Sequence, residues 1–144
     1  MQKELIEHRE LIGKQIVDIA FHIHKALGPG LLESFYETCF CYELTKRQIP
    51  FIAQKKVSIF YDEIEFAEGL RLDLLIDDLI IVELKAQENY HPVWEAQLLS
   101  YLKLSGKAFR LYNQLCCTVN KGWYKANGSL ILSVTFCLCA FEAN

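Results

Sequence analysis

The sequence predicts one mixed α/β domain, on the evidence of its apolar periodicity, its length and its composition. The apolar period is helical up to about residue 48, alternates from Phe51 onwards and is helical again after Pro92. Of the 144 residues, 52% are hydrophobic and 23% are charged, which fits one domain with a sizeable core and argues against disorder. Residues 1–144 contain no repeat and no linker, so we expect helices packed against one sheet.

Two helices are predicted at the start of the chain. The first spans Leu5 to Leu27 and ends at Gly28-Pro29-Gly30, because proline cannot continue a helix. The second runs from about Leu31 to Gln48, before Pro50. The side chains expected to face the core are Leu5, Leu11, Ile12, Ile16, Ile19, Ala20, Ile23 and Leu27 in the first helix, and Leu32, Phe35, Tyr36, Cys39, Phe40 and Leu44 in the second.

Strands are predicted in the middle of the chain, where the period changes. A strand is expected from Phe51 to Phe60, and two more from Gly69 to Ile76 and from Leu79 to Leu84. The last of these is almost continuously apolar, as in a strand covered on both faces. A helix is expected over about Val93 to Ser105, and further strands near Ala108 to Val119 and Leu130 to Cys139.

Composition narrows the class of protein. The charged N-terminus lacks the apolar region of a signal peptide, and the apolar stretch Leu130–Ala140 is too short for a span of about 20 residues. We therefore expect a soluble, cytoplasmic protein with no membrane partner. The six cysteines lack C-x-x-C spacing and are expected to be free thiols. A net charge of −3 counts against nucleic-acid binding, although one candidate basic patch comprises Lys46, Arg47, Lys55 and Lys56.

Three charged residues, Asp73, Glu83 and Lys85, lie within or at the ends of the apolar predicted strands. Buried charges are costly unless they pair or hold a metal ion. Glu83 and Lys85 are two residues apart and share a face. A two-residue turn at Asp77-Asp78 would place Asp73 opposite Val82, on the other face, whereas a three-residue turn would place it opposite Glu83. A functional site therefore requires the three-residue turn.

The spacing of Asp73 and Glu83-Leu84-Lys85 resembles the signature of the PD-(D/E)xK nuclease superfamily. The resemblance implies a restriction-endonuclease-like core of order αβββαβ, with a mixed sheet flanked by helices. It also implies hydrolysis of phosphodiester bonds, in DNA rather than RNA. Asp73 and Glu83 would bind Mg²⁺, or Mn²⁺ in its place, and Lys85 would help to activate water. Hard cations do prefer carboxylate oxygens, but a surface salt bridge is the alternative explanation.

Two further matches extend the resemblance from about Ile12 to Phe109. The segment Gly30–Tyr36 fits the G-x-x-E-x-x-Y pattern of a bacterial branch of the superfamily, and this resemblance implies that Glu33 is a third metal-binding carboxylate. Tyr36 and His24 are candidate substrate-binding residues. The alternatives are a helix-dipole role for Glu33 and core positions for the other two.

Gln97 and Tyr101 are four residues apart on the predicted later helix, and so share a face. They resemble the Q-x-x-x-Y element of RecB-type nucleases, which implies that both help to orient the catalytic site. The alternative is a helix with one buried tyrosine and one surface amide.

The resemblance stops after Phe109. Back-translating the chain from Arg110 and moving one nucleotide along can give Gly-Phe-Ile-Ile-Asn-Phe, close to the expected family ending. We therefore hypothesise that a frameshift replaced residues 110–144. The rival function is a non-catalytic nucleic-acid-binding or protein-interaction module, and the state of association, including a homodimer, stays open.

Overall fold

The computed structural model of the chain describes residues 2–85, 112–116 and 130–135, together with the helical positions Val93, Ala96 and Ser100. Most of the helix expected over 93–105 and most of the segment 110–144 lie outside the described residues, so the frameshift hypothesis stays a prediction. The elements are α1 (Gln2–Leu27), α2 (Glu33–Lys46), β1 (Phe51–Tyr61), β2 (Ile64–Ile76), β3 (Ile80–Lys85), β4 (Tyr112–Cys116) and β5 (Leu130–Thr135).

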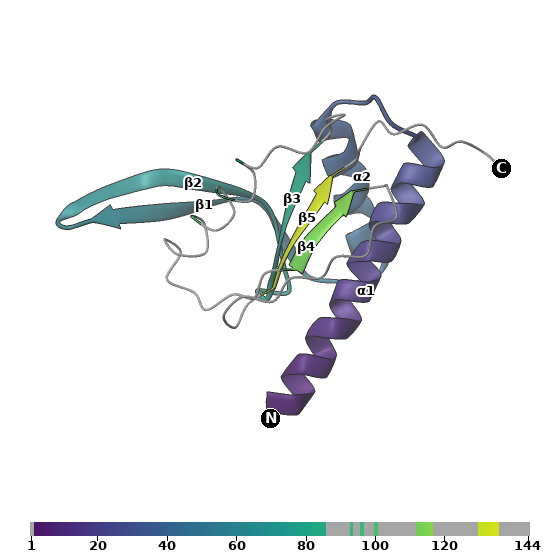
Figure 1. Cartoon of the computed structure of the whole chain (residues 1–144), viewed down its shortest axis with the longest axis horizontal. Helices are drawn as coiled ribbons and strands as arrows, with labels where there is room; N and C mark the ends of the chain where they lie inside the picture. Colours follow the sequence, from purple (N-terminus) through teal and green to yellow (C-terminus); the bar gives the residue numbers. More distant parts are fainter. Residues whose placement is uncertain are drawn as a thin grey trace.

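The strands form one mixed sheet in the order β1-β2-β3-β5-β4. β1, β2 and β3 are antiparallel neighbours, whereas β5 runs parallel to both β3 and β4. In Figure 1, β1 and β2 form a long hairpin that projects from the rest of the molecule. The predicted α/β fold, with three antiparallel strands after two helices, is confirmed.

Both helices pack against the same face of the sheet, where they build the core. α1 contributes residues at helical spacing and α2 contributes Tyr36, Phe40 and Leu44, all fully buried. From the sheet come alternate residues, which share one face of each strand. The core members on α1 and the sheet are Ile12, Ile16, Ile19, Ala20, Ile23, Leu74, Ile76, Ile80, Val82 and Leu84.

Five of the predicted core positions are wrong. Leu5, Leu11 and Leu27 of α1 are exposed, and so are Leu32 and Phe35 near the start of α2. The N-terminal part of α1, which includes Leu5, extends past the sheet in Figure 1. Leu11 precedes Ile12 by one residue, and a helix turns about 100° between neighbours, so only one of the two can face the core.

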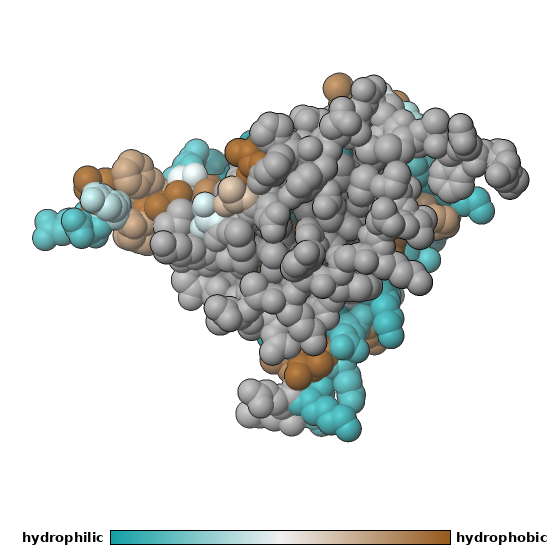
Figure 2. Space-filling model, in the orientation of Figure 1, coloured by the Kyte–Doolittle hydropathy of each residue, from teal (hydrophilic) through white to brown (hydrophobic). Residues whose placement is uncertain are grey.

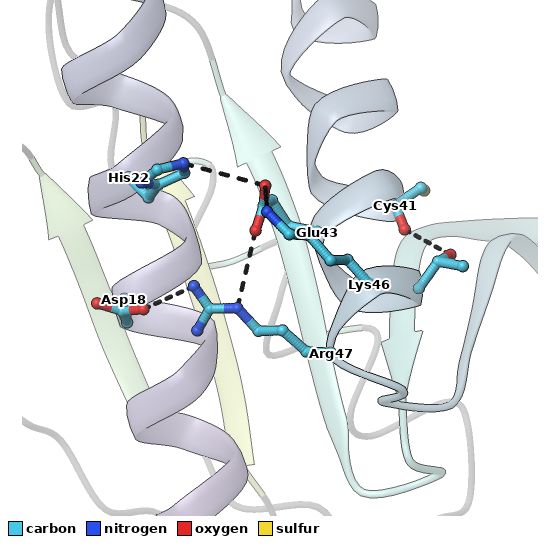
Figure 3. Close-up of polar contacts among 7 residues, drawn as sticks. Asp18, His22, Cys41, Glu43, Lys46 and Arg47 are labelled. Atoms are coloured by element: carbon cyan, nitrogen blue, oxygen red, sulfur yellow. Dashed lines mark hydrogen bonds and ion pairs between the residues drawn. The ribbon is translucent and has the colours of Figure 1, made fainter.

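A buried carboxylate joins α1 to α2. Glu43 of α2 is 8% exposed, and its carboxylate lies 3.8 Å from Arg47 Nε and 4.0 Å from His22 Nε2 of α1. Arg47 in turn contacts Asp18 of α1 at 2.7 Å. Figure 3 shows these groups converging between the two helices. The network compensates the burial of Glu43 and fixes how the helices pack.

Arg47→Met is expected to destabilise the fold by about 1–3 kcal/mol, because it leaves the Glu43 carboxylate buried without its arginine. The value lies below that of a fully buried pair since the Arg47 side chain is 26% exposed. Lys46→Met is the matched control, as Lys46 is 63% exposed and its ammonium is 3.8 Å from the same carboxylate. Urea unfolding measures both variants, and equal losses would contradict the assignment.

Candidate active site

The turn between β2 and β3 decides which side chains share a face. Ile76 pairs with Ile80, so the turn has the three residues 77–79. Asp77 and Asp78 have φ of 53° and 50°, a left-handed conformation that aspartate tolerates better than most residues. The Asp77 amide donates to the Pro50 carbonyl at 2.7 Å, and His8 Nε2 of α1 lies 2.5 Å from Asp77 Oδ2. The three-residue turn that the functional hypothesis requires is confirmed.

This register places Asp73, Glu83 and Lys85 on one face. Leu74 pairs with Val82, so the next step of the ladder sets Asp73 opposite Glu83. The Leu84 amide donates to Asp73 Oδ2 at 2.9 Å, and Lys85 Nζ lies 3.7 Å from Glu83 Oε2. Leu74, Val82 and Leu84 occupy the opposite face, in the core between the sheet and the helices. The three charged groups therefore lie on the side of the sheet that α1 and α2 do not cover.

Glu83 is the most perturbed of these groups. It is 7% exposed, and its Oε1 atom is buried with no hydrogen-bond partner among the described residues. Burial, and after it the nearby Asp73 carboxylate, raise the pKa of Glu83 to about 8 against the opposing effect of the Lys85 ammonium. A buried carboxylate held beside a second carboxylate is an arrangement found at functional sites.

The carboxylates of Asp73 and Glu83 fit a divalent cation. Such an ion would accept the unpartnered Oε1 atom as a ligand and would remove the repulsion between the two carboxylates. Within the part of the chain that the structure describes, no group of three or more His, Cys, Asp or Glu side chains is arranged to hold a metal ion. Glu33 is thus not brought into a cluster with the other two. Two carboxylates suffice for Mg²⁺, which usually keeps several waters.

Glu33 and Tyr36 lie at the start of α2, the end of the molecule towards which β3 points in Figure 1. Tyr36 is fully buried, where its hydroxyl donates to the Gly28 carbonyl at 2.7 Å and accepts from the Leu31 amide at 3.3 Å. The hydroxyl thereby holds the loop that connects α1 to α2. Gly28, at φ 67°, ends α1 in a conformation that glycine adopts without strain.

Tyr36→Phe is expected to destabilise the protein by about 1–2 kcal/mol, because the Gly28 carbonyl loses its buried donor. Tyr42→Phe is the matched control, since Tyr42 lies on the same helix and is 66% exposed. Chemical denaturation followed by circular dichroism measures both. A loss of the same size for Tyr42→Phe would contradict the role assigned to the Tyr36 hydroxyl.

His24 lies in the last turn of α1 and is 6% exposed. Burial lowers its pKa, which keeps the imidazole neutral near pH 7. Gln97 and Tyr101 fall outside the described residues, so their predicted place beside the site stays a prediction.

The basic patch expected over residues 46–56 is neutralised by carboxylates. Each of its members has an acidic partner: Lys46 with Glu43, Arg47 with Asp18, Lys55 with Asp78 and Lys56 with Glu68. Sequence analysis missed Arg71, which lies two residues before Asp73 on β2 and therefore on the same face. Alternation along the strand was the signal that would have found it.

The sequence profile of the PD-(D/E)XK nuclease superfamily matches residues 10–125. This match covers most of the chain, including most of α1, all of α2 and the carboxylate-bearing strands, so the chain belongs to the PD-(D/E)XK nuclease superfamily. No curated protein and no solved structure matches it. None of the described helices is both long enough and apolar enough to cross a membrane.

Proposed function

We propose that this protein is a metal-dependent nuclease that hydrolyses phosphodiester bonds, in DNA rather than RNA. The observation that carries the proposal is the three-residue turn that sets Asp73 opposite Glu83 and leaves Lys85 3.7 Å from the Glu83 carboxylate. Two carboxylates and an ammonium on one sheet face are the groups that metal-assisted hydrolysis needs.

Asp73 and Glu83 would hold the ion, with Mg²⁺ as the first choice and Mn²⁺ as a substitute. The bound ion would lower the pKa of a water molecule and polarise the phosphate. Lys85 would stabilise the hydroxide and the negative charge that develops on the phosphoryl oxygens. We propose that Glu33 contacts the metal ion through a water molecule. Glu33 begins the helix nearest the end of β3 in Figure 1.

The remaining residues are proposed to support this centre. Gln97 and Tyr101 would orient Lys85 and the substrate. Tyr36 and His24 are buried, so we propose that they affect substrate binding indirectly, by supporting the loop that joins α1 and α2. We also propose membership of the GxxExxY branch, a bacterial source and a cytoplasmic location, on the match of Gly30–Tyr36 to the branch pattern.

The test is incubation of the purified protein with labelled single-stranded and double-stranded DNA and RNA, in Mg²⁺ or Mn²⁺. Cleavage is expected with the metal and is expected to disappear in EDTA and in Lys85→Ala. Lys3→Ala, at a lysine of α1 whose side chain is 89% exposed, is the matched control and is expected to cleave as the wild type does. A folded protein that cleaves none of these substrates would refute the proposal.

A second candidate function is a nucleic-acid-binding or protein-interaction module without catalysis. The observation that favours it is the pairing of all four residues of the basic patch with carboxylates, which leaves that patch little net positive charge for phosphates. Binding to DNA in EDTA, with no cleavage after Mg²⁺ is added, would support the module over the nuclease.

The frameshift at about Arg110 also stays a proposal. Reading the DNA of the gene tests it, because codons that cannot encode the family ending in the shifted frame would exclude it. The carboxylates and Lys85 precede the junction, so the proposed chemistry does not depend on the outcome.

A further inference from the structure

The hairpin of β1 and β2 extends well beyond the strand that supports it. β3 pairs with β2 only at Leu74, Leu75 and Ile76, whereas β1 and β2 stay paired as far as Tyr61 and Ile64. Figure 1 shows this distal part reaching away from the other elements. A two-stranded hairpin on its own is marginally stable in water, so this one needs a surface to pack against.

The two faces of the distal hairpin differ in character. Directly paired residues share a face, and residues two apart along a strand share it too. The pairs Val57–Leu70, Ile59–Phe66 and Tyr61–Ile64 therefore lie on one side. We call these six residues the apolar stripe. On the other side are Ser58, Lys56 with Arg71, and Phe60 with Glu65.

The apolar stripe is open to solvent at its outer end. Tyr61 is 70% exposed, Ile64 54% and Phe66 51%. Figure 2 shows hydrophobic residues gathered along this projection behind a hydrophilic tip. Gly69 has no side chain, which lets Ile59 of the stripe pack directly over its backbone. A Cβ atom at this position would lie only 2.6 Å from Ile59 Cδ1. Exposed apolar surface of this kind marks an interaction site.

The charges at the two ends of the stripe have opposite sign. Lys55, which pairs with Leu72, lies at its inner end on the same face, and its 3.9 Å contact with the exposed Asp78 carboxylate is weak enough to be exchanged for one across an interface. Asp62 and Glu63 form the turn at its outer end. Ile59 lies near the middle of the stretch of β1 between these charges. At the rise of an extended strand, it is about 10 Å from Asp62 in the turn and about 13 Å from Lys55. The surface is therefore complementary to itself after a half turn about its midpoint.

We propose that two copies of this chain form a dimer by packing their apolar stripes face to face in antiparallel orientation. A two-fold axis near Ile59 and Phe66 brings Lys55 of each copy beside Asp62 and Glu63 of the other, whereas a parallel arrangement sets like charges together. The contact is isologous and closes after two copies. It goes beyond the proposed nuclease activity and does not depend on it.

The size of the stripe predicts a weak, reversible dimer. Burial of the exposed parts of two aromatic and several aliphatic side chains removes about 1,000 Å² in total, the lower end of specific interfaces. The stripe continues the core face of the sheet, so the face that carries Asp73, Glu83 and Lys85 points away from the contact. The dimer contact therefore covers neither of the two carboxylate sites.

The test is sedimentation velocity of the full chain over a series of concentrations, in EDTA so that nuclease chemistry plays no part. A monomer–dimer equilibrium is expected, and Tyr61→Asp is expected to weaken it by about 10-fold or more. Phe60→Asp is the matched control, since Phe60 is 64% exposed on the other face of the same strand. A chain that stays monomeric throughout, or a dimer that Phe60→Asp weakens as much as Tyr61→Asp does, would overturn the proposal.

A charge exchange tests the orientation without removing apolar contacts. Lys55→Glu is expected to weaken the dimer several-fold, and adding Glu63→Lys to the same chain is expected to restore it, because each contact across the axis regains opposite charges. Failure of the second change to restore association, in chains with the circular dichroism spectrum of the wild type, would exclude the antiparallel arrangement.

Discussion

Cleavage of DNA is expected to fall by about 100-fold or more when Asp73 is replaced by asparagine. Loss of a group that only supports a metal ligand already costs about 10–100-fold in affinity or activity, and Asp73 is proposed to bind the ion directly. Asparagine keeps an oxygen that can accept from the Leu84 amide, so the hydrogen bond at 2.9 Å and the fold are expected to survive. The rate at saturating Mg²⁺ and the calorimetric affinity for the metal are the measurements.

Asp78→Asn is the matched control for this change. Asp78 is a carboxylate in the adjacent turn, 70% exposed, and its φ of 50° is one that asparagine tolerates. It is expected to cleave at nearly the wild-type rate. If Asp73→Asn retained full activity and metal affinity, the carboxylate pair would have only a structural role, and the proposal that it forms the nuclease site would be wrong.

The stability of the metal-free protein is expected to fall as the pH rises from about 5 to about 8. The pKa of Glu83 is about 8 in the folded chain, against an ordinary value of 4.5. Between these values the folded state holds a proton that the unfolded state has lost, so raising the pH favours unfolding. The contribution of Glu83 is present below its ordinary pKa and is lost through the folded pKa. A loss on the order of a few kcal/mol is expected.

Glu83→Gln isolates this effect, because the amide has the same shape and does not ionise. In EDTA the variant is expected to be more stable than the wild type at pH 8–9 and to depend less on pH. Mg²⁺ is expected to stabilise the wild type, by binding the ionised form, and to leave Glu83→Gln unchanged. Thermal unfolding at several pH values makes the comparison. Parallel pH profiles for the two proteins would mean that Glu83 is not the group that titrates.

The fold was predictable where the apolar pattern is regular. Phe40, Tyr36 and Leu44 follow helical spacing and are fully buried, and the continuous apolar run of β3 is covered as expected. The long hairpin was not predicted, because β2 begins at Ile64 rather than at Gly69. The apolar period of a sequence reflects which side chains are buried. In this stretch the side chains are exposed and the register shifts between Val57 and Ile59, so the period does not mark the strand.

The sequence could single out candidate site residues but could not decide their geometry. The spacing of Asp73, Glu83 and Lys85 left two registers open, and only backbone pairing at Ile76 and Ile80 decides between them. The contact between His8 and Asp77 joins residues 69 positions apart, which no local pattern can reveal. The pKa of Glu83 likewise depends on how deeply the strand is covered, a property of the packed chain.

The three-residue turn between β2 and β3 also limits how this protein can change in length. One added or deleted residue would send every side chain of β3 to the opposite face, so that Glu83 would enter the core while Val82 left it. Two added residues would preserve both faces. Natural variation at this turn is therefore expected to come in even steps, and a survey of turn lengths in proteins of this superfamily with the same strand order would show whether selection respects that parity.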